Sequence, residues 1–327
     1  MKKLRRELTF ALINSLVWSF RIANRKLARQ IGAFMGIIWI HLSQRDRFLT
    51  SRNLKIAYGS KLSTRGAERM ARECFLNSGL FLADILRMKD KYITELTGKI
   101  DVIGLENFDR AYRRNRGVIA ATGHIGNFEI LAAFFGQSGY KTAVIGREAY
   151  DRRLDQILRE LRESNRAMNV PTTQVKRFIS LLKEGYAIGV LIDLDSHRVK
   201  SEQVESYGRL ANTPIGQALI GIKLGCGFVP VVCRRLKDRY ALKIFPEVLP
   251  RTFSGRQNAN LLSAVDITWR IRKILDSAVD RDPTQWPWLH NRWHTSPDYN
   301  APKPLGLGLF ESLKKTNGHR ASFFQTS

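Results

Sequence analysis

The sequence predicts an α/β fold in which a mostly parallel central sheet is flanked by helices. Two observations lead to this prediction. From residue 100 onwards, apolar runs of strand length alternate with amphipathic segments of helix length. The runs at 118–121 and 187–192 are continuously apolar, which is typical of strands covered on both faces. Strands that alternate with helices in this way build a parallel sheet between two helical layers.

Residues 1–45 are predicted to form a membrane-associating helical segment in front of this domain. The basic start resembles a secretory signal, but no convincing cleavage site follows. The apolar stretches 8–20 and 31–42 are both shorter than the roughly 20 residues that cross a bilayer. With Arg21, Arg25 and Lys26 between them, they predict two interfacial helices on an anionic leaflet. Core helices of a soluble domain and an uncleaved single-pass anchor remain alternatives.

Residues 46–296 are predicted to form the catalytic domain, and 297–327 a tail whose Pro-, Gly- and Ser-rich composition predicts disorder. The segment 46–98 has helical apolar spacing throughout. After it, strands are expected at 100–103, 118–121, 142–145, 187–192, 227–233 and 240–245. Helices are expected at 105–115, 127–136, 151–165, 174–183, 213–224 and 261–280.

The charge balance indicates an anionic partner. Lys and Arg number 54 against 29 Asp and Glu, which gives a net charge of +25. Nucleic acid, an acidic protein and an anionic membrane surface all fit such a charge. The three cysteines form no CxxC pair, which indicates a reducing compartment without structural disulfides, and no zinc-ligand spacing is present.

The segment 117–130 carries the strongest candidate for chemistry. Its apolar run stops at His124, which lies between Gly123 and Gly126, and Asn127 is placed to cap the helix that contains Glu129. A histidine at the end of a strand lies where open α/β sheets keep reactive groups. If the Glu129 carboxylate accepts a hydrogen bond from one ring nitrogen of His124, the other ring nitrogen is left free to act as a base. A structural histidine and a surface glutamate form the alternative.

The substrate is expected to supply the nucleophile. The sequence contains no Gly-x-Ser-x-Gly elbow, and no cysteine stands in a reactive context. His124 would therefore act as general base on a substrate hydroxyl. The acidic pair Asp193 and Asp195, followed by His197, could bind a divalent cation, but we favour a site without metal.

The run Gly123–Glu129 resembles the His-x4-Glu signature of the bacterial lipid A biosynthesis acyltransferases, the lauroyl and myristoyl transferase family. This family lies within the lysophospholipid acyltransferase superfamily, whose glycerolipid members usually carry His-x4-Asp. The resemblance covers roughly residues 45–295. Further matching blocks are Arg52-Asn53-Leu54, Gly146-Arg147, Asp193-Leu194-Asp195, Gly208-Arg209, Val229-Pro230-Val231 and Gln285–Trp293.

The resemblance implies transfer of a fatty acyl chain from an acyl carrier protein to a hydroxyl of a lipid A precursor, without a covalent acyl-enzyme and without a cofactor. His124 would be the base and Glu129 would orient it. Arg162 would face the oxyanion, with Arg159 as its rival. Substrate contacts would come from the following residues: Asn127, Arg147, Arg159, Asp193 and Asp195. Arg147 is a candidate for pairing with an acceptor phosphate.

The resemblance also places the protein on the cytoplasmic face of the bacterial inner membrane, with an acyl carrier protein, a phosphorylated glycolipid and an anionic leaflet as partners. An acyltransferase for another glycolipid or for a lysophospholipid is the nearest alternative, although Glu129 in place of aspartate disfavours the latter. A nucleic-acid-binding protein would explain the charge, but it would leave the apolar N-terminus and residues 123–129 unexplained. No zinc-finger, RRM or helix-turn-helix signature supports it, so we expect no nucleic-acid partner.

Overall fold

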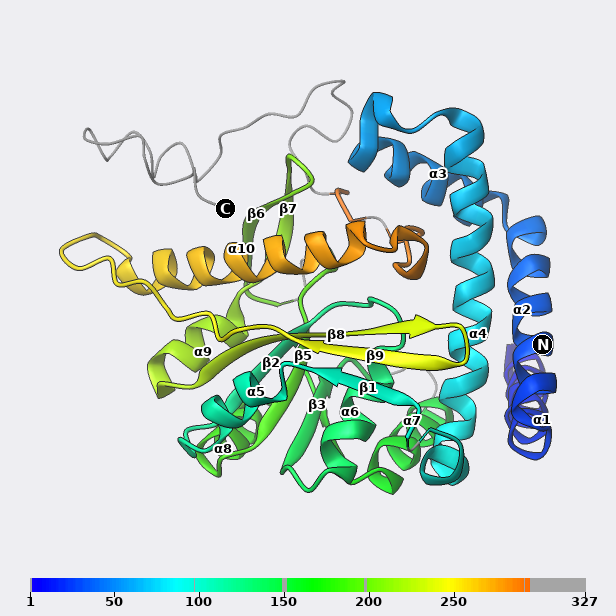
Figure 1. The fold of residues 1–327 in the computed structure, drawn as a ribbon, viewed down its shortest axis with the longest axis horizontal. Helices are drawn as coiled ribbons and strands as arrows, with labels where there is room; N and C mark the ends of the chain where they lie inside the picture. Colours follow the sequence, from blue (N-terminus) through cyan, green and yellow to red (C-terminus); the bar gives the residue numbers. More distant parts are fainter. Residues whose placement is uncertain (1, 97, 149–151, 197–198, 291, 295–327) are drawn as a thin grey trace.

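The computed structural model describes the whole chain except residues 1, 97, 149–151, 197–198, 291 and 295–327 (Figure 1). The predicted tail 297–327 therefore lies outside the described residues. The helices are α1 Lys2–Ile22, α2 Arg25–Leu42, α3 Gln44–Tyr58, α4 Thr64–Leu96, α5 Leu105–Tyr112, α6 Phe128–Gln137, α7 Arg152–Ser164, α8 Val175–Lys183, α9 Gly216–Leu224 and α10 Ala259–Asp280. Two 3-10 turns are η1 Gly59–Lys61 and η2 Pro283–Gln285.

Seven strands form the central sheet in the order β1-β9-β8-β2-β5-β3-β4. All neighbouring strands are parallel except β8 and β9, which confirms the predicted mostly parallel sheet. The strands are β1 Ile100–Ile103, β2 Val118–Thr122, β3 Thr142–Gly146, β4 Ala167–Pro171, β5 Ala187–Leu191, β8 Gly227–Leu236 and β9 Arg239–Ile244. A separate antiparallel hairpin consists of β6 Ser201–Ser206 and β7 Arg209–Pro214.

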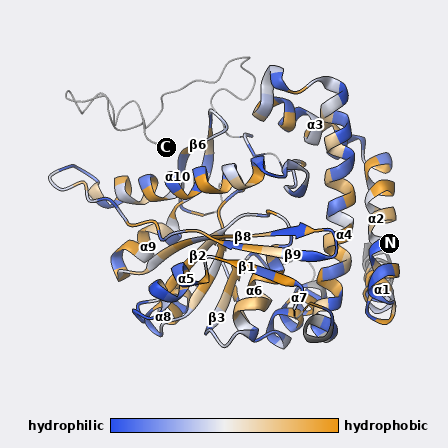
Figure 2. Ribbon diagram, viewed as in Figure 1, coloured by the Kyte–Doolittle hydropathy of each residue, from blue (hydrophilic) through white to orange (hydrophobic). Residues whose placement is uncertain are grey.

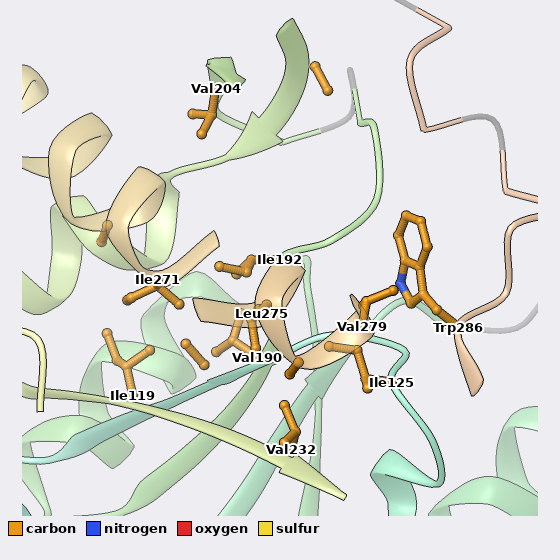
Figure 3. Packing of buried hydrophobic residues seen from close by; sticks show 14 of the residues in the cluster. Ile119, Ile125, Val190, Ile192, Val204, Val232, Ile271, Leu275, Val279 and Trp286 are labelled. Atoms are coloured by element: carbon orange, nitrogen blue, oxygen red, sulfur yellow. The ribbon is translucent and has the colours of Figure 1, made fainter. Parts of the chain in front are cut away.

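The two faces of the sheet carry two cores. Ile119 and Ala121 of β2 pack with residues of α8, α9 and α10, whereas Val118 and Ala120 pack with α5, α6 and α7. Figure 3 shows the first of these cores, where Ile271, Leu275 and Val279 of α10 lie over the strands. Because side chains alternate between the faces of a strand, a continuously apolar β2 serves both cores.

Three strands were not predicted, and the helix at 213–224 was predicted to begin too early. Thr213 and Pro214 end β7, and α9 starts at Gly216. Only two of the six side chains in β6 are buried, so this strand lacks the hydrophobic alternation by which strands are recognised. Its pairing comes from backbone bonds to β7. The edge strand β4 is short and contains Asn169 and a terminal proline, which weakens its signal in the same way.

The long helix α4 stands across the carboxyl end of β8, and α1 and α2 lie along its outer side (Figure 1). Glycines allow α2 to approach closely: a Cβ at Gly79 would lie 1.9 Å from the carbonyl oxygen of Gly32. Among the described residues, no helix combines the length and the apolar character needed to cross a membrane. Figure 2 shows hydrophobic and hydrophilic residues mixed along α2.

We expect Gly79→Val to lower the free energy of unfolding by about 1–3 kcal/mol, because the added side chain forces the α2 and α4 backbones apart. Thermal unfolding of purified protein measures the effect. Gly216→Ala is the matched control, since a Cβ there lies 3.9 Å from its nearest neighbour. Equal unfolding temperatures for both variants would show that the contact between α2 and α4 is loose.

Candidate active site

His124 lies at the carboxyl end of β2, the strand paired with both β5 and β8. The loop behind it is fixed by Gly126, which has a φ of 59° and bridges to Cys233 of β8. A Cβ at Gly126 would lie 1.9 Å from the carbonyl oxygen of Cys233, so only glycine permits this approach. The backbone N–H of Gly126 also donates to the carbonyl of Gln285 at 2.8 Å. These contacts set the position of the histidine.

Asp193 holds the imidazole of His124 from the neighbouring strand. One oxygen, Oδ1, lies 2.8 Å from Nδ1 of His124, and Oδ2 accepts from the His124 backbone N–H at 2.6 Å. The Trp286 indole N–H also donates to Oδ2, at 2.7 Å. A Cβ at Gly123 would lie 2.8 Å from this oxygen, which explains the glycine before the histidine. The carboxylate therefore fixes both the backbone and the ring of His124.

His124 and Asp193 each shift the pKa of the other. Burial disfavours the ionised form of Asp193, but attraction and hydrogen bonding to His124, with the nearby charge of Arg272, hold the pKa of this carboxyl well below its usual range. Burial likewise opposes protonation of His124, but Asp193 outweighs it and raises the pKa of the imidazole above 6.5. With an ionised carboxylate on Nδ1, the proton of the neutral ring stays on Nδ1 and leaves Nε2 as the base.

Glu129 makes no hydrogen bond to the ring of His124, which corrects the predicted pairing, although its negative charge also helps to raise the pKa of the imidazole. In the first turn of α6 its side chain is buried on the α7 side, where its two oxygens accept from Nε and Nη2 of Arg162 at 3.0 and 2.6 Å. The reason is geometric, because His124 and Asp193 follow adjacent parallel strands and so meet at one edge of the sheet. The carboxylate that is hydrogen-bonded to the ring is thus Asp193, which was predicted to be a substrate contact.

Arg162 and its predicted rival Arg159 have different surroundings. Arg162 is largely buried, and besides Glu129 it donates to Asn169 of β4. A Cβ at Gly146, the last residue of β3, would lie 3.4 Å from its Nη1, so the guanidinium lies near the carboxyl edge of the sheet. Arg159 is 55% exposed and pairs with Asp155 one turn earlier on α7. Only Arg162 is thus brought close to the other site residues.

Asn127 directly precedes α6, in the N-cap position as expected, but its side chain makes no cap hydrogen bond. It is buried and donates weakly, at 3.5 Å, to the Phe81 carbonyl and the Tyr240 hydroxyl. Because it is not exposed, a direct substrate contact by this side chain is not supported here. The backbone N–H of Gly126, just before this helix, is bonded to the carbonyl of Gln285.

The remaining predicted residues lie further out. Arg147 directly follows β3 and is exposed. Asp195 is half-buried two residues beyond Asp193, and its charge acts on buried Arg292. His197 lies outside the described residues. Within the described part of the chain, no group of three His, Cys, Asp or Glu side chains is arranged to hold a metal ion.

Asn53, for which the sequence predicted no role, connects α3 to the segment after α10. Its side-chain amide donates to the carbonyls of Trp288 and His290, at 2.7 Å each, across more than 230 residues. The ring of His290 lies 5.5 Å from that of His124. Burial, together with repulsion from His124, lowers the pKa of His290 to about 4. The available signal was that Asn53 and Gln285–Trp293 both lie in blocks that resemble the family.

A small apolar cavity of about 30 Å³ lies between α6 and the sheet, lined in part by Phe128, Phe135 and Glu129. Sites for small organic ligands measure roughly 300–1,000 Å³. In this arrangement the cavity is a packing void and does not hold an acyl chain.

A base held by a buried carboxylate, at the carboxyl edge of an α/β sheet, is typical of an enzyme that activates a hydroxyl for group transfer. The chain belongs to the bacterial lipid A biosynthesis acyltransferase family, whose sequence model matches residues 1–295. Membership makes it an acyltransferase, as the sequence resemblance predicted. The family assignment covers the N-terminal helices as well as the catalytic domain.

Individual relatives are distant. The chain is 23% identical over 274 residues to the lipid A biosynthesis palmitoleoyltransferase of Escherichia coli (strain K12), covering 82% of this chain and 85% of that protein. It is 25% identical over 277 residues to the lipid A biosynthesis lauroyltransferase of the same organism, with 82% and 86% covered. It is also 24% identical over 200 residues to the phosphatidylinositol mannoside acyltransferase of Mycolicibacterium smegmatis, with 60% and 62% covered.

Glu129→Gln is expected to lower the free energy of unfolding by about 3 kcal/mol, because it leaves the buried charge of Arg162 without its carboxylate. Chemical denaturation measures the effect. Glu163→Gln, an exposed position one residue after Arg162, should be nearly neutral. Adding Arg162→Met to Glu129→Gln should recover part of the loss, since no unpaired charge then remains. A fully stable Glu129→Gln protein would contradict a structural role for this ion pair.

Proposed function

We propose that the protein transfers a fatty acyl chain from the thioester of an acyl carrier protein to a hydroxyl of a lipid A precursor. The observation that carries the proposal is the hydrogen bond between His124 and Asp193, which leaves Nε2 of the histidine as a base for a substrate hydroxyl. The cysteines support direct transfer: all three are buried, and burial raises the pKa of Cys226 to about 11 and those of the other two further.

In the proposed reaction, Nε2 of His124 takes the proton of the acceptor hydroxyl as its oxygen attacks the thioester carbonyl. A carbon–oxygen bond forms, and the charge moves onto the carbonyl oxygen of a tetrahedral intermediate. Asp193 stabilises the imidazolium, whose proton then passes to the departing sulfur as the carbon–sulfur bond breaks. Atoms and charge balance without a covalent acyl-enzyme.

Arg162 is our proposed partner for the oxyanion. Glu129 raises its pKa despite burial, so the guanidinium stays charged close to the edge of the sheet. A fixed positive charge in a partly buried site stabilises developing negative charge without having to reorganise. In this proposal Glu129 positions Arg162 and contributes only indirectly to the chemistry at His124.

The outer surface of the N-terminal helices supports a position on the membrane. Many of the exposed large hydrophobic residues of the described chain lie on α1, α2 and α3, and these are Trp18, Ile22, Leu27, Phe34, Ile38, Trp39, Leu42 and Phe48. Interfacial helices bury such side chains among lipid acyl chains. We propose that this surface rests on the cytoplasmic face of the bacterial inner membrane, where the charge of +25 favours both an anionic leaflet and an acidic carrier protein.

A second candidate acceptor is another glycolipid. The identity to a phosphatidylinositol mannoside acyltransferase, 24% over 60% of this chain, lies between the identities to the two lipid A enzymes, 23% and 25% over 82% of the chain. These identities therefore do not distinguish a lipid A precursor from another glycolipid as the acceptor.

The test is acyl transfer by purified protein, supplied with acyl carrier protein or coenzyme A thioesters and with either a lipid A precursor or a phosphatidylinositol mannoside. We expect the lipid A precursor to be acylated faster, and faster from the carrier protein. Mass spectrometry of lipid A from a deletion strain should show one acyl chain missing. Transfer to the mannoside alone would replace the first proposal by the second.

A further inference from the structure

A second, strongly basic cavity lies apart from His124, between α2, α4 and the turn that joins β8 to β9. Its volume is about 460 Å³. Six of its lining side chains are basic, and Asp238 is the one carboxylate among them. The basic residues come from α2, from the segment before β1 and from the turn, and they are Arg25, Lys26, Arg29, Lys99, Arg235 and Lys237.

The arginines are fixed in place and are not free surface charges. Arg29 Nη2 donates to the Lys237 carbonyl at 2.9 Å, and Arg235 Nη1 donates to the same oxygen at 3.2 Å. Behind them, Asp84 pairs with Arg25 and Arg29, whose side chains are only 13% and 14% exposed. Arg29 thus holds the turn against α2, and Arg235 supports the turn from its own strand, so the cavity has a defined shape.

Part of the donor capacity in this cluster is unused. Arg25 Nη2 and Arg235 Nε are buried without a hydrogen-bond acceptor in the protein, whereas Arg29 Nε lies 3.3 Å from Oδ2 of Asp84 without forming an aligned hydrogen bond. Burying such a donor without an acceptor is costly. Burial and the charge of Arg29 also lower the pKa of Arg235, which shows how crowded the cations are. The planar guanidinium groups that line the cavity match the oxygens of a phosphate.

The dipole of α2 adds to this preference for an anion. Arg25, Lys26 and Arg29 occupy the first turns of α2, and that first turn contains no acidic residue. Cations at a helix N-terminus are unfavourable because the dipole is positive there. An anion in the cavity would offset the repulsion between these cations and the helix dipole, and it would also lie next to the arginines.

The surroundings indicate a lipid as the source of the phosphate. Leu27, Phe34 and Ile38 of α2 are exposed beside the face that lines the cavity. The cavity also lies at the same end of the sheet as His124, since Cys233 pairs with Gly126 and Arg235 follows two residues later. At about 3.3 Å per residue, β8 carries Arg235 about 7 Å beyond this pairing.

We propose that this cavity binds the phosphate group of an anionic membrane lipid, with Arg25, Arg29 and Arg235 as its ligands. The choice of a lipid over free phosphate rests on the proposed membrane-bound function. Binding is measured without acyl transfer, so its failure is distinguishable from failure of the proposed reaction.

The test is co-sedimentation with phosphatidylcholine vesicles that contain either phosphatidic acid or the same charge of oleate. Wild type should bind the phosphatidic acid vesicles at least about 10-fold more tightly, because charged hydrogen bonds to phosphate add to the general attraction. Arg25→Gln with Arg29→Gln should abolish this preference. Lys26→Gln with Lys237→Gln is a second variant. The two lysine side chains line the cavity but make no hydrogen bond among the described residues, so their replacement should keep the fold. This variant should reduce the preference for phosphatidic acid.

The matched control is Lys176→Gln with Lys223→Gln, which removes two exposed charges on α8 and α9, far from α2 in Figure 1. It should keep the preference for phosphatidic acid. Equal binding of wild type to both kinds of vesicle would overturn the proposal in favour of general electrostatics. A preference that survives in both cavity variants would place the site elsewhere. Saturable binding of inorganic phosphate without any preference among vesicles would overturn the lipid as the source.

Discussion

His124→Ala is expected to lower kcat/KM for acyl transfer by about 10³-fold, because it removes the imidazole proposed as the base for the acceptor hydroxyl. The ring of His290 lies 5.5 Å from that of His124, but burial and repulsion from His124 lower its pKa to about 4, which makes it the weaker base. Initial rates with a purified acyl donor and acceptor measure the effect. The fold should persist, since the side chain of His124 is partly exposed.

His41→Ala is the control for this variant, because His41 is an exposed histidine on α2. It should keep the wild-type rate. Circular dichroism and the unfolding temperature show whether both proteins are folded. A His124→Ala protein with more than about a tenth of the wild-type rate would contradict a general-base role.

Asp193→Asn is expected to reduce kcat/KM by about 10³- to 10⁴-fold, the effect seen when a carboxylate that orients a catalytic histidine is neutralised. The asparagine keeps the size of the side chain, but it can present an N–H to Nδ1 and favour the wrong tautomer. Combined with His124→Ala it should cost little more than either change alone, because the two residues act as a unit.

The pH dependence of the same variant has a definite sign. A general base works when neutral, so the wild-type rate should fall as the pH drops through the raised pKa of His124, above 6.5. Without Asp193 the imidazolium loses its main stabilisation while burial remains. The acid limb of kcat/KM should therefore move to lower pH in Asp193→Asn. A limb that does not move would show that Asp193 does not interact with the catalytic base.

The position of His124 was predictable because it depends on local signals. The buried run 118–122, the glycine pair and the helix after Asn127 are all encoded within a few residues. Strand pairing is different. Asp193 lies 69 residues from His124, and nothing local indicates that β5 pairs with β2 in the register that brings them together.

The partner of Glu129 was missed for a similar reason. Five residues separate it from His124, and whether the two side chains converge depends on the path of the loop between them. In the fold, α6 directs Glu129 towards α7, where it pairs with Arg162, 33 residues later in the chain. The polar hairpin of β6 and β7 was not predicted, because β6 lacks hydrophobic periodicity.

The most direct test compares Asp193→Asn and Glu129→Gln in one acyl-transfer assay, with each rate divided by the fraction of folded protein. If Asp193 orients the base, its variant should lose at least about 10³-fold in rate while remaining folded, and Glu129→Gln should lose less per folded molecule and more in stability. An Asp193→Asn enzyme close to wild type, beside a folded but inactive Glu129→Gln enzyme, would contradict the account.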